Sequence, residues 1–194
     1  LLIYFFSTIF IIFLYSLSNV RLLDAFNLAF TTISSGGFIP TDNLSDIVVS
    51  NLQTFVFGIT LLFPIFNFYL LFNIFTKKFR YKNHQEDLHL AFLIILLTLF
   101  FYFFIIPNEG VVDIFLIITS SIATSGIATY SSNYDLSLLL ILLTVVGGAL
   151  ISASSGFKYV RFYILLKVSY QEIYRLVKPI NIFDKNLFNT ESKI

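Results

Sequence analysis

Long apolar runs separated by short polar stretches make up most of the chain. The runs cover residues 1–17, 47–75 and 88–106, and a further run starts at residue 136 and continues past 150. Because about 20 helical residues cross the hydrocarbon core of a bilayer, each run predicts a membrane-spanning helix. The pattern therefore predicts an all-α, polytopic membrane protein.

Two polar stretches that contain glycine interrupt this pattern where a helix would lie inside the bilayer. One is Ser34-Ser35-Gly36-Gly37-Phe38, and the other is Ala123-Thr124-Ser125-Gly126-Ile127. A helix over residues 24–34, which precede the first stretch, would be roughly 15 Å long, about half of the hydrocarbon thickness. We therefore expect a short helix that enters the membrane and returns instead of crossing it.

The two stretches belong to an internal repeat. Residues 24–38 align without a gap on residues 113–127, at an offset of 89 positions, and the flanking elements follow the same order in both copies. Repetition of a whole unit predicts two units, each with an outer helix, a short pore helix, an unwound segment and an inner helix. The identical pairs are Asp24/Asp113, Phe26/Phe115, Ile33/Ile122 and Gly37/Gly126, and the pairs Thr31/Ser120, Thr32/Ser121 and Ser35/Thr124 keep a hydroxyl.

Unwound backbone at membrane depth has few physical explanations. An unpaired backbone group in lipid costs several kcal/mol, so such backbone is buried in protein or lines water. Carbonyl oxygens that face a shared axis can replace the hydration shell of a cation, and the partly negative C-terminal ends of two short helices favour a cation as well. The pattern favours a cation pathway, and the alternative is that Gly36-Gly37 and Ser125-Gly126 are only tight turns between helices.

Composition and charge agree with a membrane protein and orient it. The chain is 57% hydrophobic and 12% charged, with a mean hydropathy of +0.87. Basic residues cluster at 77–82 and 158–193, whereas residues 18–46 and 107–135 hold six acids and Arg21 as their only basic residue. Because positive loops stay on the cytoplasmic side, we expect the basic stretches there and the acidic face outside.

Two residue types are absent from the chain. It has no cysteine, which excludes disulfides and thiolate metal sites within this sequence. It also has no methionine, and residue 1 already lies inside an apolar run. We therefore expect the chain to be a piece of a longer polypeptide.

Four stretches carry a family resemblance: AFNLAFTTISSGGFIPTDN, FPIFNFYLLF, SIATSGIATYSSNYD and GGALISASSGFKYVRFYILLK, the last followed by RLVKPI. They resemble the Trk/Ktr/HKT potassium-transporter superfamily, most closely its TrkH-type membrane subunit, in the family's order and over nearly the whole chain. The resemblance implies potassium (monovalent cation) uptake across the bacterial inner membrane, by the second and third of four pore repeats. It places the selectivity filter at Ser35, Gly36, Gly37 and Phe38 and at Thr124, Ser125, Gly126 and Ile127.

The last apolar span contains a run of small residues that would interrupt a helix. Glycine and serine in mid-span are tolerated near a cavity or a protein neighbour, and the alternative is a helix-packing face of the GxxxG type. The resemblance implies an intramembrane gating loop here. The chain departs from the family at Ile151, Ala153 and Ser155, which predicts a stiffer loop. The loop residues are Gly147, Gly148, Ser152, Ser154, Ser155 and Gly156, with Lys158 and Arg161 on a basic cytoplasmic face.

The division into units and the partners follow from the repeat and the resemblance. We expect one pore repeat in residues 1–82, a second in 83–180, and a polar tail or connection in 181–194. The resemblance implies a homodimer, embedded in the lipid bilayer, that sits on a cytoplasmic nucleotide-binding subunit of the TrkA type. Potassium is the expected substrate, no covalent cofactor is expected, and nothing indicates nucleic acid.

One cluster of polar side chains lies at the start of the span that begins near residue 88. His84, Glu86, Asp87 and His89 have spacings that would allow a metal site on a helix, but helix capping and solvation explain them more simply. Asn67, within an apolar run, is expected to form an interhelical hydrogen bond, and the alternative is a contact with the permeation path.

Two other functional classes compete with a cation pore. A secondary transporter with broken helices would bind a small solute at the membrane midplane, but that class often has inverted repeats, whereas these repeats are parallel. An intramembrane enzyme needs ionisable groups at membrane depth, and no such group lies inside the predicted spans. The stretch GGALISASSGFK also fits neither the phosphate-loop motif nor the serine-nucleophile motif. The sequence therefore predicts that the protein is not an enzyme.

Overall fold

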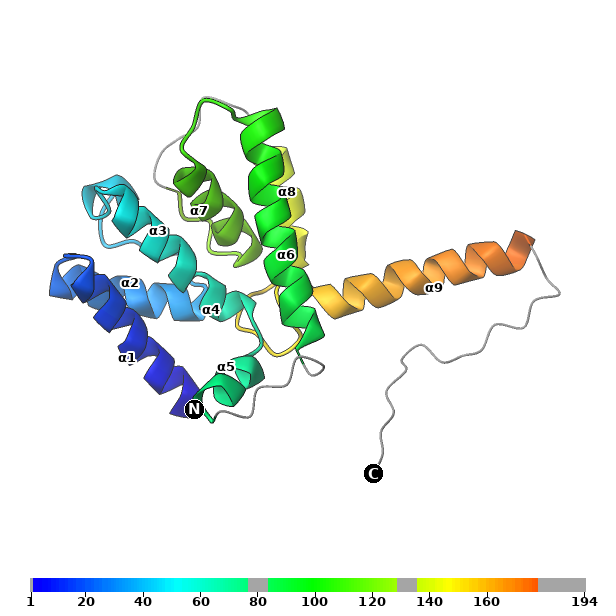
Figure 1. Cartoon of the computed structure of the whole chain (residues 1–194), viewed down its shortest axis with the longest axis horizontal. Coiled ribbons are helices and arrows are strands. Elements are labelled where there is room, and N and C mark those ends of the chain that lie inside the picture. Colours follow the sequence, from blue (N-terminus) through cyan, green and yellow to red (C-terminus); the bar gives the residue numbers. More distant parts are fainter. Residues whose placement is uncertain (1, 77–83, 129–135, 178–194) are drawn as a thin grey trace.

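The computed structural model describes residues 2–76, 84–128 and 136–177, and within them the chain is helical apart from one short β-pair (Figure 1). The predicted all-α fold is therefore confirmed. The elements are α1 (Leu2–Leu17), α2 (Leu22–Ser34), η1 (Leu44–Asp46), α3 (Asn51–Thr60), α4 (Leu62–Ile65), α5 (Phe68–Phe75), α6 (Gln85–Phe100) with a π-helical end η3 (Phe101–Ile105), α7 (Val111–Ile122), α8 (Ser137–Val145), β1 (Val146–Gly147), β2 (Phe157–Lys158) and α9 (Tyr159–Val177).

Helices α1, α2 and α3 pack around buried side chains that recur along one face of α1. Ser7, Ile11 and Tyr15 are four residues apart and are all buried, as helical periodicity requires. The Tyr15 ring stacks on Phe57 of α3 at a centroid distance of 5.9 Å, and its hydroxyl lies 2.5 Å from the Thr60 hydroxyl. A buried phenol with a satisfied hydroxyl fixes the contact between α1 and α3.

The apolar run 47–75 does not form one straight helix, a feature that the sequence pattern did not predict. The chain bends by 107° between Asn51–Ile65 and Phe68–Ile74. Pro64 has no N–H to donate within the helix, and Phe66 leaves it with extended backbone at ψ 160°. Asn67 then starts α5, where its side-chain oxygen accepts the N–H of Tyr69 at 2.9 Å.

The run 88–106 forms the longest apolar helix. By length and composition, Gln85–Ile105 is the one continuous helix of the described residues that can cross a bilayer, and the bent pair at α3–α5 would count as a second. Three apolar helices are shorter: Leu2–Leu17, Leu22–Ser34 and Val111–Ile122. The last two are the predicted half-length helices.

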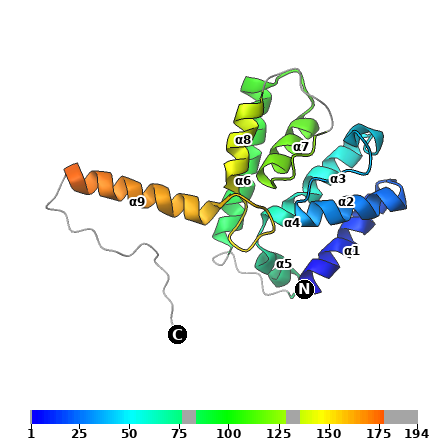
Figure 2. The ribbon, with the colours of Figure 1, turned by 180° about the vertical axis from the view of Figure 1, so that it is seen from behind.

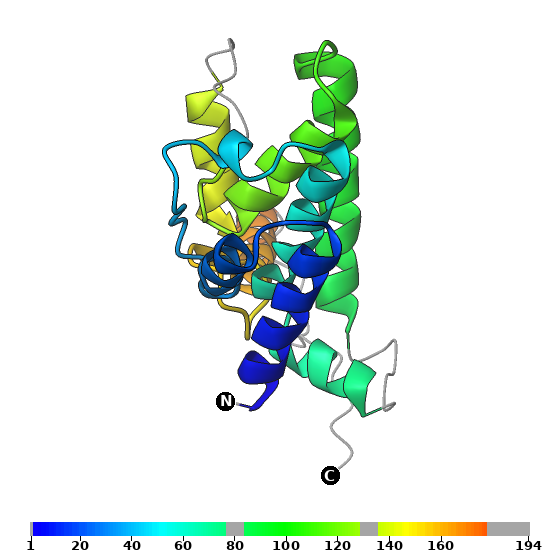
Figure 3. The same ribbon diagram turned by 90° about the vertical axis from the view of Figure 1, so that its left-hand side faces the viewer.

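Helix α7 lies between α6 and α8, as Figure 3 shows. The chain then leaves helix α8 after Val145 and re-enters helix at Tyr159. Between these residues, β1 and β2 pair in parallel, with Val146 opposite Phe157 and Gly147 opposite Lys158. Figure 2 shows α9 extending away from the rest of the molecule.

Candidate functional site

Helix α2 ends in a left-handed turn at the first predicted filter stretch. Ser35 has φ 53°, and Gly37 has φ 74°. The N–H of Ser35 donates to the Thr32 carbonyl at 3.1 Å, and that of Gly36 donates to the Thr31 carbonyl at 2.9 Å. These bonds satisfy carbonyls at the helix end and turn the chain out of the helix.

Helix α7 ends in the same way. Thr124 has φ 60°, and Gly126 has φ 67°. The N–H groups of Thr124 and Ser125 donate to the carbonyls of Ser121 and Ser120, each at 3.0 Å. Each of these four residues lies 89 positions after its counterpart at α2, so the backbone follows the offset found in the sequence.

The two turns lie against each other. Gly37 packs on the backbone of Ser125, and a Cβ at position 37 would overlap the Ser125 carbonyl oxygen. A Cβ on Gly126 would meet no atom within 4 Å. The structure therefore brings both glycines to one place, with Gly37 confined and Gly126 facing open space.

Hydroxyl groups from both helices support the turns. The Thr31 hydroxyl accepts the Phe38 N–H at 2.7 Å, and the Ser120 hydroxyl lies 3.1 Å from that of Ser125. The last residues of the two stretches differ, because Phe38 is 81% exposed and Ile127 is 2% exposed. The repeat therefore extends to the turns but not to the environment of the residue that follows each glycine.

An open groove of about 570 Å³ borders the second turn. It lies between the end of α7, the end of α8 and the loop that joins β1 to β2. Most of its lining surface is apolar, and its polar part comes from hydroxyl and backbone groups at the end of α7 and in the loop. The lining residues are Thr124, Ser125, Gly126, Thr144, Val145, Ser155, Gly156 and Phe157.

The predicted gating residues form a compact loop, residues 147–158, which we call the small-residue loop. The Gly148 N–H donates to the Ser154 hydroxyl at 2.9 Å, and the Ser152 and Ser154 hydroxyls are 3.1 Å apart. Gly156 has φ 86°, and a Cβ on Gly147 would overlap the Ser155 carbonyl oxygen. Glycine at these two positions is therefore required by backbone conformation and by close approach.

The small-residue loop docks into the break between α4 and α5. Ala149 N–H donates to the Ile65 carbonyl at 2.8 Å, and Ser154 N–H donates to the Pro64 carbonyl at 3.0 Å. In the other direction, Phe68 N–H donates to the Ile151 carbonyl at 3.0 Å. Two interrupted helices thus satisfy each other's free backbone groups, which is how non-helical backbone survives away from water.

The loop also contacts the end of α7 through side chains. The Thr124 hydroxyl accepts the Ser155 N–H at 3.1 Å, and the two hydroxyl oxygens are 2.7 Å apart. The middle of the small-residue loop is therefore held beside the second turn.

The first turn of α6 anchors both the loop and the break. Glu86 accepts the Leu150 N–H at 2.7 Å, and Asp87 accepts the Asn67 N–H at 2.8 Å. His84 lies 3.0 Å from the Asn73 amide and 3.4 Å from the Asp87 carboxylate, and it is 1% exposed. Solvation therefore does not explain His84 and Asp87, which are buried, whereas His89 is exposed as the sequence interpretation expects.

Two further expectations about polar residues need adjustment. The Asn67 side chain caps its own helix, and it is the Asn67 backbone that bonds to α6. Lys158 was assigned to a basic face, but its ammonium group bonds within the small-residue loop, whereas Arg161 is exposed. In the described part of the chain, no three His, Cys, Asp or Glu side chains form a group that could hold a metal ion.

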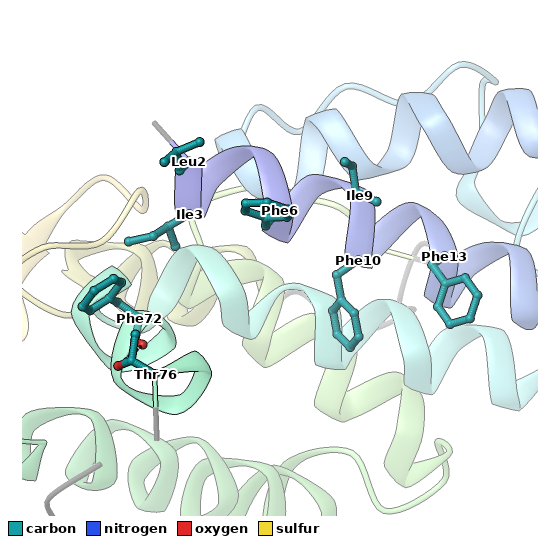
Figure 4. A pocket seen from close by; sticks show the side chains of 8 residues that line it. All are labelled: Leu2, Ile3, Phe6, Ile9, Phe10, Phe13, Phe72 and Thr76. Carbon is teal, nitrogen blue, oxygen red and sulfur yellow. Dashed lines mark hydrogen bonds between the residues drawn. The ribbon is translucent and has the colours of Figure 1, made fainter. Parts of the chain in front are cut away.

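A larger groove, of about 630 Å³, runs along the outside of α1 (Figure 4). Its lining is aromatic and aliphatic apart from Thr76, so it offers no set of oxygen ligands to a cation. The lining residues are Leu2, Ile3, Phe6, Ile9, Phe10, Phe13, Phe72 and Thr76.

Sequence reasoning missed the residues that receive the loop. Pro64 and Ile65 supply carbonyls to it, and Glu86 supplies a carboxylate. A proline inside the apolar run was an available signal for the break. No local signal connects residue 65 with residue 149, because that pairing depends on how the whole chain folds.

Comparisons with known proteins give two curated relatives, and no protein-family model matches the chain. The chain is 29% identical over 185 residues to the Trk system potassium uptake protein TrkG of Escherichia coli, an alignment that covers 89% of this chain and 38% of TrkG. It is 26% identical over 189 residues to an uncharacterized cation transporter of Methanocaldococcus jannaschii, covering 91% of this chain and 37% of that protein.

A solved structure shares the fold. The potassium transporter TrkH from Vibrio parahaemolyticus superposes with a TM-score of 0.76 at 24% sequence identity, over 91% of this chain and 41% of that one. The chain thus spans about two fifths of the length of the proteins it matches. The relatives are named as transport proteins, in agreement with the prediction that the chain is not an enzyme.

Proposed function

We propose that the chain forms part of a pore for potassium or another monovalent cation. The chain is a relative of the TrkH-type transporters; it is a membrane protein and not an enzyme. The observation that carries this proposal is the pair of left-handed turns that α2 and α7 bring together. Each turn follows a half-length apolar helix and contains a glycine with positive φ: Gly37 in one and Gly126 in the other.

The chemistry of the paired turns suits a cation. Carbonyl oxygens next to a glycine can turn toward an ion, and the C-terminal end of a helix carries a partial negative charge. The hydroxyls of Thr124 and Ser125 add oxygen atoms to the groove beside Gly126.

In this proposal, two filter segments and one gating loop have separate roles. Ser35–Phe38 and Thr124–Ile127 contribute to the selectivity filter, and residues 147–156 form the gate. The chain divides into pore repeats at 1–82 and 83–180, and residues 181–194, which lie outside the described residues, form a tail or a connection. Two segments do not close a ring around an ion, so further segments complete the pore.

The wider setting is proposed on the basis of the resemblance. The protein resides in the bacterial inner membrane, forms a homodimer and binds a nucleotide-binding subunit of the TrkA type on its cytoplasmic side. Arg161, exposed on α9, belongs to the basic surface proposed for docking. The basic cluster at 77–82 lies outside the described residues.

One observation favours a second candidate, a secondary transporter for a small solute. Helices are broken at α4–α5 and at α8–α9, and broken helices line the substrate sites of such transporters. In this chain, however, α1 and α6 run in the same direction, as do α3 and α8 (Figures 1 and 2), which supports parallel and not inverted units. Flux of a non-ionic solute coupled to protons or sodium would support this candidate.

Complementation tests the cation pore. The full-length protein is expressed in a bacterium that lacks its own potassium uptake, with Gly37→Val and Gly126→Val introduced together. We expect growth on low potassium to be lost while the protein still reaches the membrane. Gly110→Ala is the control outside the two turns, because Gly110 has φ −64° and an added methyl group meets the end of the Asp113 side chain and no backbone atom. Normal growth of the double variant would refute the pore.

A further inference from the structure

The ammonium group of Lys158 lies in a cage of oxygen atoms supplied by its own loop. It is 3.2 Å from the Ser152 carbonyl and 3.0 Å from the Ser152 hydroxyl, and it also contacts the Ser154 carbonyl. An ammonium has three N–H donors, and here three acceptors surround it. Bonds from a charged donor are about twice as strong as neutral ones.

These contacts close the loop on itself. Lys158 pairs through its backbone with Gly147, at the start of the loop, and through its side chain with the middle of the loop. The adjacent Tyr159 N–H donates to the Gly148 carbonyl at 3.2 Å. The docking bonds to α4 and α5 come from the backbone of other loop residues, so Lys158 shapes the loop and does not dock it.

The caged segment is also the one that contacts the second turn. Ser154 receives the ammonium, and the next residue, Ser155, bonds to the Thr124 hydroxyl beside the groove. Gly156 and Phe157 then line that groove together with Gly126. A displacement of residues 152–155 would move Ser155 away from Thr124 and would therefore widen the groove at Gly126.

We propose that Lys158 is a positioning residue whose ammonium group, as a cation fixed in the chain, holds residues 152–155 of the small-residue loop against the turn at Thr124. The loop is closed while the ammonium fills its oxygen cage and opens when the cage is released. The effect on transport rests on the proposed cation pore, whereas the effect on loop structure does not.

The experiment uses the full-length protein with Lys158→Met, which keeps the length of the side chain and removes its charge and donors. Lys158→Arg restores charge and donors, and Lys158→Gln provides a second uncharged variant in case the methionine variant does not fold. Lys167→Met is the matched control, because Lys167 lies on α9 outside the loop. The substitution Ala153→Cys, in a stretch that otherwise has no cysteine, reports loop opening through the rate at which the thiol reacts with a water-soluble reagent.

Two readouts are taken: the labelling rate of the cysteine, and rubidium flux into vesicles that contain the purified protein. We expect Lys158→Met to raise both at least fivefold, Lys158→Arg to restore most of the difference, and Lys167→Met to change neither. If Lys158 acted only through packing, Lys158→Met would have labelling and flux close to those of the wild type, and Lys158→Arg would depart from them more. Unchanged labelling in Lys158→Met and Lys158→Gln, or faster labelling with reduced flux, overturns the proposal. Faster labelling in a protein that passes no rubidium in any form supports the loop inference and refutes the pore.

Discussion

At the scale of single residues, Gly37 and Gly126 share a backbone conformation and differ in their surroundings. Both have positive φ, at 74° and 67°. Only Gly37 is pressed against another backbone, that of Ser125. Repeated sequence thus gives repeated conformation, while the contacts that each copy makes depend on its place in the molecule.

The difference predicts unequal effects of the same substitution. Gly126→Ala should cost about 1–2 kcal/mol, from the left-handed conformation alone. Gly37→Ala should cost at least about 1 kcal/mol more, because its methyl group also overlaps a carbonyl that cannot rotate away. The thermal midpoints of the two purified proteins measure this order. Gly126→Asn is the control, because asparagine tolerates positive φ, and its thermal midpoint should lie between those of Gly126→Ala and the wild type. Equal thermal midpoints for the two alanine variants would contradict the packing argument.

The Thr124 hydroxyl is the other residue-level contact with a testable role. It joins the turn after α7 to the Ser155 N–H and hydroxyl. Thr124→Val keeps the shape and removes both bonds, so we expect a loss of about 1–2 kcal/mol in unfolding free energy and faster labelling of a cysteine at Ala153. Thr144→Val is the comparison, since the Thr144 hydroxyl donates to the Ile141 carbonyl of its own helix and, within the described residues, does not bond to the loop. A similar change in both variants would argue against a specific link.

At the scale of elements, the break between α4 and α5 and the small-residue loop form one structural unit with the start of α6. Three backbone hydrogen bonds join the break to the loop. Two adjacent acids of α6 then reach both parts: Glu86 accepts a loop N–H, and Asp87 accepts an N–H of the break while also pairing with His84. The N-terminal turn of a helix is a favourable place for these carboxylates.

Removal of one anchor should loosen this unit. Asp87→Ala leaves the Asn67 N–H without its charged acceptor, so we expect a loss of about 1.5–3 kcal/mol in unfolding free energy. His89→Ala, on the exposed side of the same turn, should change it by less than about 0.5 kcal/mol. Thermal unfolding of both variants in detergent gives the comparison, and equal midpoints would show that Asp87 is no anchor.

At the scale of the whole molecule, α3 and α7 join the N-terminal and C-terminal halves. Gly58 of α3 lies under the Phe115 ring of α7, where an added Cβ would be 2.7 Å from a ring carbon. Phe55, one turn earlier, meets the same ring at a centroid distance of 6.0 Å. The close approach of the two helices therefore depends on the missing side chain at position 58.

A larger residue at this contact should separate the halves. Gly58→Val is expected to destabilise the protein by about 1–3 kcal/mol through overpacking and to reduce rubidium flux, because α7 carries the second turn. Leu52→Val on the exposed face of α3 is the control. The refutation would be wild-type thermal stability and flux in Gly58→Val.

The sequence predicted the features that leave a local trace. Glycine and hydroxyl residues inside apolar runs located both left-handed turns and the interruption after α8, because those residues favour such backbone wherever they occur. Hydropathy could not locate the bend at Phe66, since a bent apolar helix and a straight one have the same average. Contacts such as Ile65 with Ala149 join residues far apart in the chain, so no periodicity encodes them. The roles of Glu86 and Asp87 were missed for the same reason.

The exchange of hydrogen bonds between the α4–α5 break and the small-residue loop has a consequence for how such a chain can change over time. A substitution that made α4 and α5 one continuous helix would leave N–H groups of the small-residue loop without acceptors. A substitution that made the loop helical would leave carbonyl groups of the α4–α5 break without donors. Either change alone would leave buried backbone groups unpaired, whereas both together would give two continuous helices. Related chains should therefore possess both irregularities or neither, and a chimera that mixes the two types should fail to mature.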